Sequence, residues 1–288
     1  MRLTFCGVRG STPAPGPEFV RYGGHTSCVS LAHPGGAPRL LLDAGTGLTN
    51  VTRLLEGEPF LGTILLGHLH WDHTHGIPFF RSGTAAGSSV HVRLPQQEPG
   101  IDGDAHEVLA RCFSPPHFPV QPRDLGGRWS FSEIVEGEHE IEGFTVLARQ
   151  IPHKGGRTFG YRVSGEGGTV AYLSDHSPTS LGPGPDGLGE RHPAALELAA
   201  GVDLLVTDAQ HTAAQFPDVA FLGHASVEYD VALAVEAGAR RLALFHHDPW
   251  RTDDEVDEVL GLAREVAAGR VEVVAAYEGM AVDVGGEE

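Results

Sequence analysis

Short apolar runs recur along most of the chain and alternate with turn signals. Each run spans four to six residues, is rich in leucine or β-branched residues, and is bounded by glycine, proline or aspartate. That length and composition are typical of buried strands and too short for helices. The runs predict strands at residues 3–6, 28–31, 39–42, 63–66, 90–94, 144–149, 169–173, 203–206, 241–245 and 271–275.

Helical periodicity appears between several of these strands. Apolar residues three or four positions apart predict helices over residues 48–55, 227–235 and 256–266, and a shorter one over 105–113. Gly238 and Gly269 follow the second and third of these segments and are typical helix stops. The pattern therefore predicts an α/β protein whose sheets are covered by helices on their outer faces.

Two segments interrupt this pattern. Residues 181–189 form a loop by their glycine and proline content. Residues 96–127, which contain the string SPPHFP at 114–119, are predicted to be an insertion over a functional site. Since the chain has no internal repeat and no low-complexity linker, residues 1–288 are predicted to form a single domain.

Charge and cysteine content exclude several classes of protein. Twenty basic and 38 acidic side chains give a formal net charge of −18, which argues against holding long nucleic acid or an anionic membrane through a general electrostatic field. The three cysteines show no C-x-x-C spacing, so we expect small buried thiols in a reducing compartment. No apolar stretch reaches the length of a membrane span and the first ten residues do not resemble a signal peptide, which predicts a cytoplasmic protein.

Histidine is the informative excess, with 17 in the chain, and it gathers in the string LLGHLHWDHTHG at residues 65–76. His68 and His70 follow an apolar strand, where side chains two positions apart project to the same side and can grip one ion. Asp72 and His73 follow where the chain turns, and point to an adjacent position. Imidazole and carboxylate together are the ligands expected for Zn²⁺, Mn²⁺ or Fe. The alternative is a run of solvated surface histidines, and His75, outside the spacing, is expected to be a surface or supporting residue.

Further acidic and histidine residues follow other predicted strands. Asp43, His153, Asp175 and His246 each come directly or closely after an apolar run. One such residue alone is commonly a cap or turn residue. Together they supply the side chains that a metal site beside His68 and His70 still needs.

The order of these residues resembles the metallo-β-lactamase superfamily, over nearly the whole chain. The resemblance implies an αββα sandwich, in which two mixed β-sheets lie face to face with helices outside, and two divalent metal ions at one edge. It favours Zn²⁺, with Mn²⁺ or Fe as alternatives. It implies direct ligands at seven positions: His68, His70, Asp72, His73, His153, Asp175 and His246.

The resemblance also assigns these ligands to the two metals. The histidines at 68, 70 and 153 would hold the first metal, and Asp72, His73 and His246 the second. Asp175 would bridge the two metals, and Asp43 would support the site without binding metal. His247 is the alternative to His246 at the last position.

Four strings resemble a phosphodiesterase branch of this superfamily that is related to ribonuclease Z. They are VRGSTPAPGPEFVRYGGHTSC at 8–28, HKGGRTFGYRV at 153–163, GHAS at 223–226 and LFHHDP at 244–249. Within that branch the chain is most similar to the small cyclic-nucleotide phosphodiesterases, including the anti-Pycsar enzymes. His25 stands where the family string has asparagine. No cysteine falls at a ligand position, which argues against antibiotic hydrolysis.

The same resemblance suggests the remaining catalytic and binding residues. His224, in the GHAS string before a helix, is placed like the histidine of ribonuclease Z that protonates a leaving group; the alternative is a structural histidine near a helix cap. Asp72 can orient the attacking hydroxide as well as bind metal. Candidate substrate contacts lie in the glycine-bearing strings: Arg9, His25, Lys154 and Arg157. Aromatic candidates for stacking a base are His117, Phe118 and Phe159, although such phenylalanines are often core residues.

These observations predict a dinuclear metal-dependent phosphodiesterase. It would hydrolyse small 3′,5′-cyclic nucleotides to 5′-monophosphates, as a homodimer in which residues 96–127 border the partner's pocket. The alternatives are a ribonuclease Z-like endonuclease for RNA 3′ ends, a non-phosphoryl hydrolase such as a lactonase, and a metal-stabilised binding module without turnover.

Overall fold

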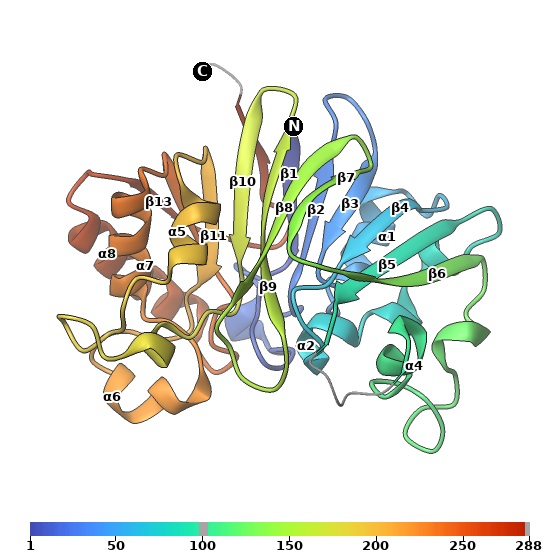
Figure 1. Ribbon diagram of the computed structural model, residues 1–288, viewed down its shortest axis with the longest axis horizontal. Helices are drawn as coiled ribbons and strands as arrows, with labels where there is room; N and C mark the ends of the chain where they lie inside the picture. Colours follow the sequence, from blue (N-terminus) through green and yellow to red (C-terminus); the bar gives the residue numbers. More distant parts are fainter. Residues whose placement is uncertain (98–102, 286–288) are drawn as a thin grey trace.

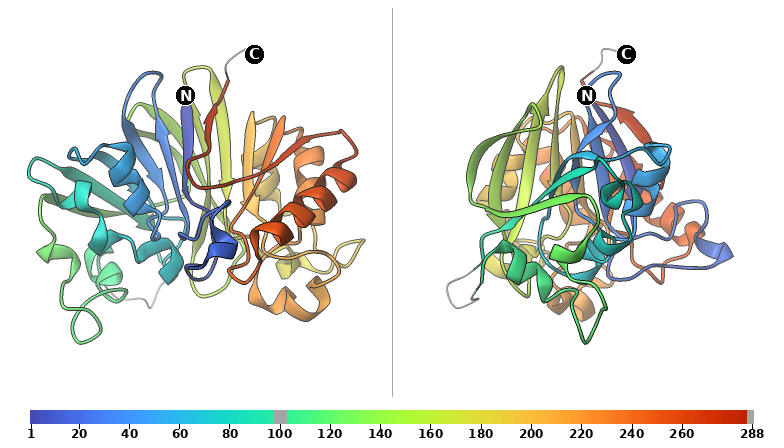
Figure 2. Two further views of the ribbon diagram at one scale, coloured as in Figure 1. Left: turned by 180° about the vertical axis from the view of Figure 1, so that it is seen from behind. Right: turned by 90° about the vertical axis from the view of Figure 1, so that its right-hand side faces the viewer.

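Two seven-stranded β-sheets lie face to face (Figures 1 and 2) in the computed structural model, which describes residues 1–97 and 103–285. In order across the first sheet the strands are β14 (Ala281–Asp283), β1 (Arg2–Gly7), β2 (Cys28–Ala32), β3 (Pro38–Leu42), β4 (Leu61–Leu65), β5 (Ser89–Pro95) and β6 (Arg128–Ile134). Neighbours from β14 to β3 pair antiparallel, and those from β3 to β6 pair parallel.

The second sheet has the same mixture of pairings. Its strands, in order, are β13 (Glu272–Ala275), β12 (Arg241–Phe245), β11 (Leu204–Asp208), β10 (Gly168–Leu173), β9 (Thr158–Gly165), β8 (Phe144–Ile151) and β7 (Gly137–Ile141). The strands from β10 to β13 are parallel, and those from β7 to β10 are antiparallel. The parallel strands of both sheets therefore end along a common edge, where ligands of open α/β sheets bind.

Helices cover the outer faces. On the first sheet lie α1 (Leu48–Leu54) and α4 (Ala105–Ala110). The one-turn helix α2 (Trp71–Thr74) lies at the lower end of this sheet in Figure 1, and α3 (Arg81–Thr84) contacts α1. On the second sheet lie α5 (Pro193–Ala199), α7 (Val227–Ala237) and α8 (Asp253–Ala267), with the short α6 (Phe216–Val219) beside them. Short 3₁₀ turns occur at Pro17–Phe19, Ile77–Phe79, Pro122–Asp124, Pro178–Leu181 and Ala220–Leu222.

Three apolar layers hold the four structural layers together. The central layer joins the two sheets and contains Phe5, Tyr161, Tyr172 and Phe245. A second layer lies between the second sheet and α5, α7 and α8, and a third between the first sheet and α1 and α4. The αββα sandwich predicted from the sequence is confirmed.

All ten predicted strands are present, with ends that differ by at most two residues, and the four predicted helices are present too. The pattern missed the strands β6, β7, β9 and β14 and the helices α2, α3, α5 and α6. β7 (sequence GEHEI) is an edge strand with an alternating exposed pattern, so it contains no apolar run. β9 is buried but contains Gly160 and Arg162, which interrupt its apolar residues.

Part of the predicted 96–127 insertion, residues 98–102, lies outside the described residues. The rest contains α4, which begins with a capping box between Asp104 and Glu107, and the Pro122–Asp124 turn. Val108 and Cys112 line a cavity that His68 also lines. That the segment is an insertion in a single domain stays a prediction. Within the part of the chain that the structure describes, no helix is both long and apolar enough to cross a membrane.

Candidate metal centre

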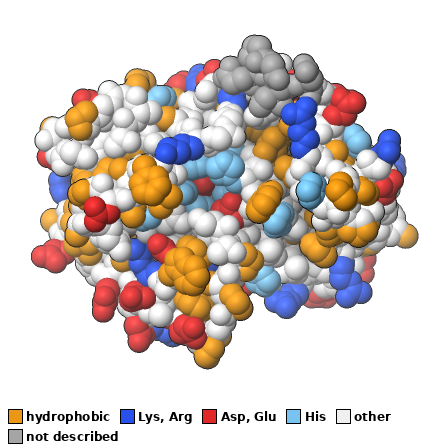
Figure 3. All heavy atoms as spheres, turned by 90° about the horizontal axis from the view of Figure 1, so that it is seen from below, with side chains coloured by type: hydrophobic (Ala, Val, Ile, Leu, Met, Phe, Trp, Pro, Cys, Tyr) orange, Lys and Arg blue, Asp and Glu red, His pale blue; other side chains and the backbone are white. Residues whose placement is uncertain are grey.

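Histidines and carboxylates from both sheets converge at the edge where the parallel strands end. From the side of the first sheet come the residues after β4, and from the second sheet the residues after β8, β10 and β12. Figure 3 shows histidines with a few carboxylates near the centre of this face, flanked by hydrophobic side chains. The site therefore depends on the packing of one sheet against the other.

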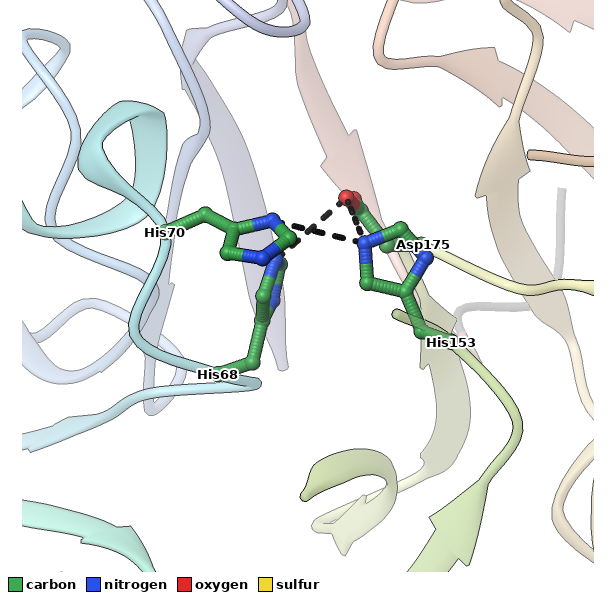
Figure 4. Close-up of side chains that lie close together, drawn as sticks. All are labelled: His68, His70, His153 and Asp175. Carbon is green, nitrogen blue, oxygen red and sulfur yellow. Dashed lines mark hydrogen bonds and ion pairs between the residues drawn. The ribbon is translucent and has the colours of Figure 1, made fainter. Parts of the chain in front are cut away.

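The first group consists of His68, His70, His153 and Asp175, whose candidate ligand atoms lie within 4.8 Å of one another (Figure 4). His153 Nε2 lies 3.4 Å from His70 Nδ1 and 3.3 Å from Asp175 Oδ2. His68 Nε2 lies 3.5 Å from the same Asp175 oxygen. Three imidazoles and one carboxylate oxygen thus face a common point.

The second group consists of Asp72, His73 and His246, next to the other oxygen of Asp175. Asp72 Oδ2 lies 3.2 Å from His73 Nε2 and 3.1 Å from His246 Nε2. Asp175 Oδ1 lies 3.3 Å from His73 Nε2 and 3.2 Å from His246 Nε2. Because its two oxygens face different groups, Asp175 is placed to bridge two ions.

The chemistry of these side chains fits divalent cations. The Nε2 atoms of His68 and His73 are buried without a hydrogen-bond partner, although a buried polar atom normally has one. Imidazole nitrogens and carboxylate oxygens in groups of three or four are the usual ligands of Zn²⁺ and related metals. Cations bound here would satisfy both orphaned nitrogens.

Burial and charge set the protonation of the cluster. Burial lowers the pKa values of His68, His70 and His153, which favours the neutral imidazole that binds metal. Burial would raise the pKa values of Asp72 and Asp175, but the neighbouring histidines hold them well below the usual range. Both carboxyls are therefore ionised and available as ligands.

Asp43 contacts the ring nitrogen of His73 that does not face Asp72 and Asp175. Its Oδ2 accepts hydrogen bonds from His73 Nδ1 and from the Tyr172 hydroxyl, both at 2.7 Å, and its Oδ1 accepts one from the Gly67 amide at 2.6 Å. With Nδ1 protonated, His73 presents Nε2 as the free ligand atom. The structure thus places Asp43 where the resemblance expected a supporting residue.

Backbone geometry fixes other members of the cluster. His153 Nδ1 donates to the Gly223 carbonyl at 2.8 Å, which turns its Nε2 towards His70. The Ser11 amide donates to Asp72 Oδ2 at 2.7 Å. Ser11, Asp43 and His246 have φ values of 60°, 62° and 52°, in the left-handed region that costs energy for residues other than glycine.

His224 forms a pair with a residue that the sequence pattern did not single out. Its Nδ1 lies 2.5 Å from Asp208 Oδ2, and Asp208 Oδ1 accepts from the Gln210 amide. Burial would lower the pKa of His224, but the charge and hydrogen bond of Asp208 outweigh it and raise this pKa to about 9. Asp208 is the last residue of β11, close after the predicted strand at 203–206, and that placement at a strand end was the available signal.

The structure separates His246 from His247. His246 faces Asp72 and Asp175, whereas His247 Nε2 donates to the Ala276 carbonyl at 2.9 Å, and its ring meets Tyr22 edge-on. His246 is therefore the residue of this pair that lies in the cluster. His75 is exposed and stacks on Trp71.

Arg9 does not have the role expected from its string. Its side chain is completely buried, and its guanidinium donates to the carbonyls of Gly23, Asp248 and Arg251 and to the Asp253 carboxylate. It joins the segment after β1 to the start of α8, so it cannot meet a phosphate. This corrects the predicted substrate contact for Arg9.

The other predicted contacts lie around the cluster. Lys154 is exposed beside His153, with its Nζ 5.6 Å from the Phe221 ring centre. Arg157 lines the cavity that His68 also lines, and its Nη1 donates to the Gln96 carbonyl. His25 Nδ1 lies 3.2 Å from the Thr46 hydroxyl.

The aromatic residues predicted to stack on a base lie in two different environments. Phe159 is buried in the central core, whereas His117 and Phe118 line a cavity near the cluster.

Comparisons with known proteins agree with this architecture. The sequence family described as "Beta-lactamase superfamily domain" matches residues 38–247. An uncharacterized protein of Mycobacterium tuberculosis is 26% identical over 264 residues, covering 89% of this chain and 84% of that protein. Ribonuclease Z of Myxococcus xanthus is 26% identical over 314 residues, covering 99% and 98% of the two chains. The crystal structure of the metallo-β-lactamase fold protein YhfI from Bacillus subtilis superposes with a TM-score of 0.69 at 19% identity, covering 98% of each chain.

Asp43→Asn tests the support of the metal centre. The amide can accept through one atom only, so the contact with His73 Nδ1, Tyr172 or Gly67 must be lost. We expect affinity for Zn²⁺ to fall about 10- to 100-fold, the usual cost of losing such a support. Competition with a chromogenic chelator measures this, with the exposed Asp283→Asn as the control. Unchanged Zn²⁺ affinity in Asp43→Asn would contradict the assignment.

Proposed function

The chain belongs to the β-lactamase superfamily, a family of metal-dependent hydrolases with phosphoesterase members, and we propose that it is a dinuclear metal-dependent phosphodiesterase. The observation that carries the proposal is the position of Asp175, with one oxygen towards each of two ligand groups. Two cations bridged by a carboxylate are the arrangement that cleaves phosphate esters in two-metal hydrolases.

The distances support the two ligand sets that the resemblance implies. His68, His70 and His153 would hold one ion, Asp72, His73 and His246 the other, and Asp175 both. We propose Zn²⁺, with Mn²⁺ or Fe as alternatives, because imidazole and carboxylate suit all three. When bound, such ions polarise a phosphoryl oxygen and supply a hydroxide at neutral pH.

Side chains that line the pocket would orient the attacking water and protonate the leaving group. A cavity of about 380 Å³ is lined in part by Asp72, Asp175 and His224. Asp72, fixed by the Ser11 amide, would accept a hydrogen bond from the attacking water. As the new bond to phosphorus forms and the bond to the 3′ oxygen breaks, His224 Nε2 would donate its proton to that oxygen, while Asp208 holds Nδ1.

His224→Ala tests the leaving-group acid. We expect kcat to fall on the order of 10²- to 10⁴-fold while metal content is unchanged, because general acid catalysis is worth that much. Asp208→Asn should lower kcat in the same direction, and the double variant should be no slower than His224→Ala, since both residues serve one proton transfer. His139→Ala, distant on β7, is the control.

The choice of substrate supplies a second measurement on these variants. A p-nitrophenyl ester has a good leaving group and should depend far less on His224. Equal losses for a poor and a good leaving group would remove His224 from this role.

We propose a small cyclic nucleotide as the substrate, cleaved from the 3′,5′-cyclic phosphate to the 5′-monophosphate. A compact monoanion needs no extended basic surface, which suits a chain with net charge −18. The second candidate is a ribonuclease Z-like endonuclease, favoured by the match to ribonuclease Z of Myxococcus xanthus along almost its full length. Two further alternatives are a lactonase and a binding module without turnover. Hydrolysis of any phosphodiester by the purified protein would argue against both.

The salt dependence of activity distinguishes a cyclic-nucleotide phosphodiesterase from a ribonuclease Z-like endonuclease. We expect kcat/KM for cyclic nucleotides to change little between 50 and 200 mM salt. A tRNA held by six or more phosphate contacts would lose roughly 10³- to 10⁵-fold in affinity over that range. The measurement incubates equal enzyme with a panel of cyclic nucleotides and with a 3′-extended tRNA precursor. Efficient tRNA trimming without turnover of any cyclic nucleotide would favour the ribonuclease.

We also propose that the protein is a cytoplasmic homodimer in which the 96–127 segment borders the partner's pocket. The string at 114–119 supports this, because Pro115, Pro116 and Pro119 are exposed and suit an interface better than solvent. Light scattering at assay concentration should give twice the 30.5 kDa mass of the chain. An active monomer would contradict the dimer.

A further inference from the structure

Trp71 is a large exposed aromatic residue at the metal centre. It begins α2 and lies in sequence between the proposed ligands His70 and Asp72. Its side chain stays 67% exposed, although its ring stacks on His75 with centres 5.4 Å apart and planes 18° apart. The stacking orients the indole against His75 and leaves its ring available to a ligand.

Trp71 lines the cavity that His68 also lines, and it belongs to the walls of two further cavities. One is the cavity of about 380 Å³ that it shares with Asp72, Asp175 and His224. The other, called here the aromatic cavity, has a volume of about 550 Å³, and six rings line it: Trp71, His75, Phe79, Phe113, His117 and Phe118. A molecule that reacts at the metal centre would therefore meet the aromatic cavity at once on passing Trp71.

The rings of the aromatic cavity support one another. Phe118 meets Phe79 edge-on at 5.7 Å and Phe113 at 6.2 Å. Phe79 nevertheless remains 58% exposed. Large exposed aromatic side chains grouped beside a reactive site are typical of a ligand-binding surface.

We propose that Trp71 and the aromatic cavity bind the base of a nucleotide whose phosphate lies at the metal centre. This inference rests on the proposed phosphodiesterase function and names the part of the substrate beyond the phosphate. Its basis is that Trp71 lines both the cavity that contains Asp72, Asp175 and His224 and the aromatic cavity. Aromatic side chains stack on the face of any base, so the site accepts different bases.

The test compares two ligands that share a phosphate and a ribose and differ in the base. Adenosine 5′-monophosphate and ribose 5-phosphate are titrated into the Zn²⁺-loaded protein by calorimetry. We expect adenosine 5′-monophosphate to bind on the order of 10- to 100-fold more tightly, as base stacking on an aromatic residue predicts. Uridine 5′-monophosphate should behave like the adenine nucleotide within about a factor of ten, since stacking tolerates base identity.

Trp71→Leu should remove most of this difference. Its affinity for adenosine 5′-monophosphate should approach that for ribose 5-phosphate, while Zn²⁺ content and ribose 5-phosphate affinity stay unchanged. Trp250→Leu is the matched control, because Trp250 is 83% exposed and lines neither cavity. Phe79→Leu gives a second variant at the other wall, with a smaller loss in the same direction.

The possible results separate the two proposals. Equal or undetectable binding of the two ligands to the natural protein overturns the base site, and so does an equal loss of both ligands in Trp71→Leu. If the base site is present but the Zn²⁺-loaded protein hydrolyses no phosphodiester, the proposed reaction fails and the nucleotide site stands.

Discussion

The convergence of seven histidine and aspartate side chains, drawn from two different sheets, is the constraint on which the rest of the structure depends. His68, His70, Asp72 and His73 approach from the first sheet, and His153, Asp175 and His246 from the second. The shortest distances between their ligand atoms are 3.1–3.5 Å, and the Nε2 atoms of His68 and His73 are buried without a hydrogen-bond partner. Such a concentration of lone pairs and negative charge is costly without cations, so the core between the sheets also positions a site that suits divalent metal ions.

The scaffold around the cluster leaves little freedom. Asp43 is held by three hydrogen bonds and in turn orients His73, so a central core residue, Tyr172, is linked to a ligand through one carboxylate. Gly10 contributes differently, since a Cβ there would lie 2.4 Å from His246 Nδ1. The left-handed backbone at Asp43 and His246 stores energy that only tight packing sustains. Stability and site geometry therefore depend on the same contacts.

The charged and aromatic side chains around the cluster determine which kind of ligand can bind there. The net charge of −18 disfavours a long polyanion, but it says nothing about the small region around the metal centre. There the exposed aromatic residues Trp71 and Phe221 line the cavities together with Lys154 and Arg157. A ring-lined cavity beside a polar pocket suits a ligand with one phosphate and one planar group better than an extended backbone.

The sequence by itself determined the ten apolar strands and the grouping of histidines and aspartates at strand ends, because apolar runs and two-residue alternation are local properties. The αββα sandwich followed from the resemblance of these residues to the metallo-β-lactamase superfamily. The sequence pattern did not predict the edge strand β7, because its pairing with β8 holds it in the sheet and it contains no apolar run. Only the tertiary structure decided that Arg9 is buried against Asp253, that His224 pairs with Asp208, and that His246 rather than His247 faces Asp72. Each of these depends on segments far apart in the chain, whose approach is set by the packing of the sheets and helices and not by any neighbour in sequence.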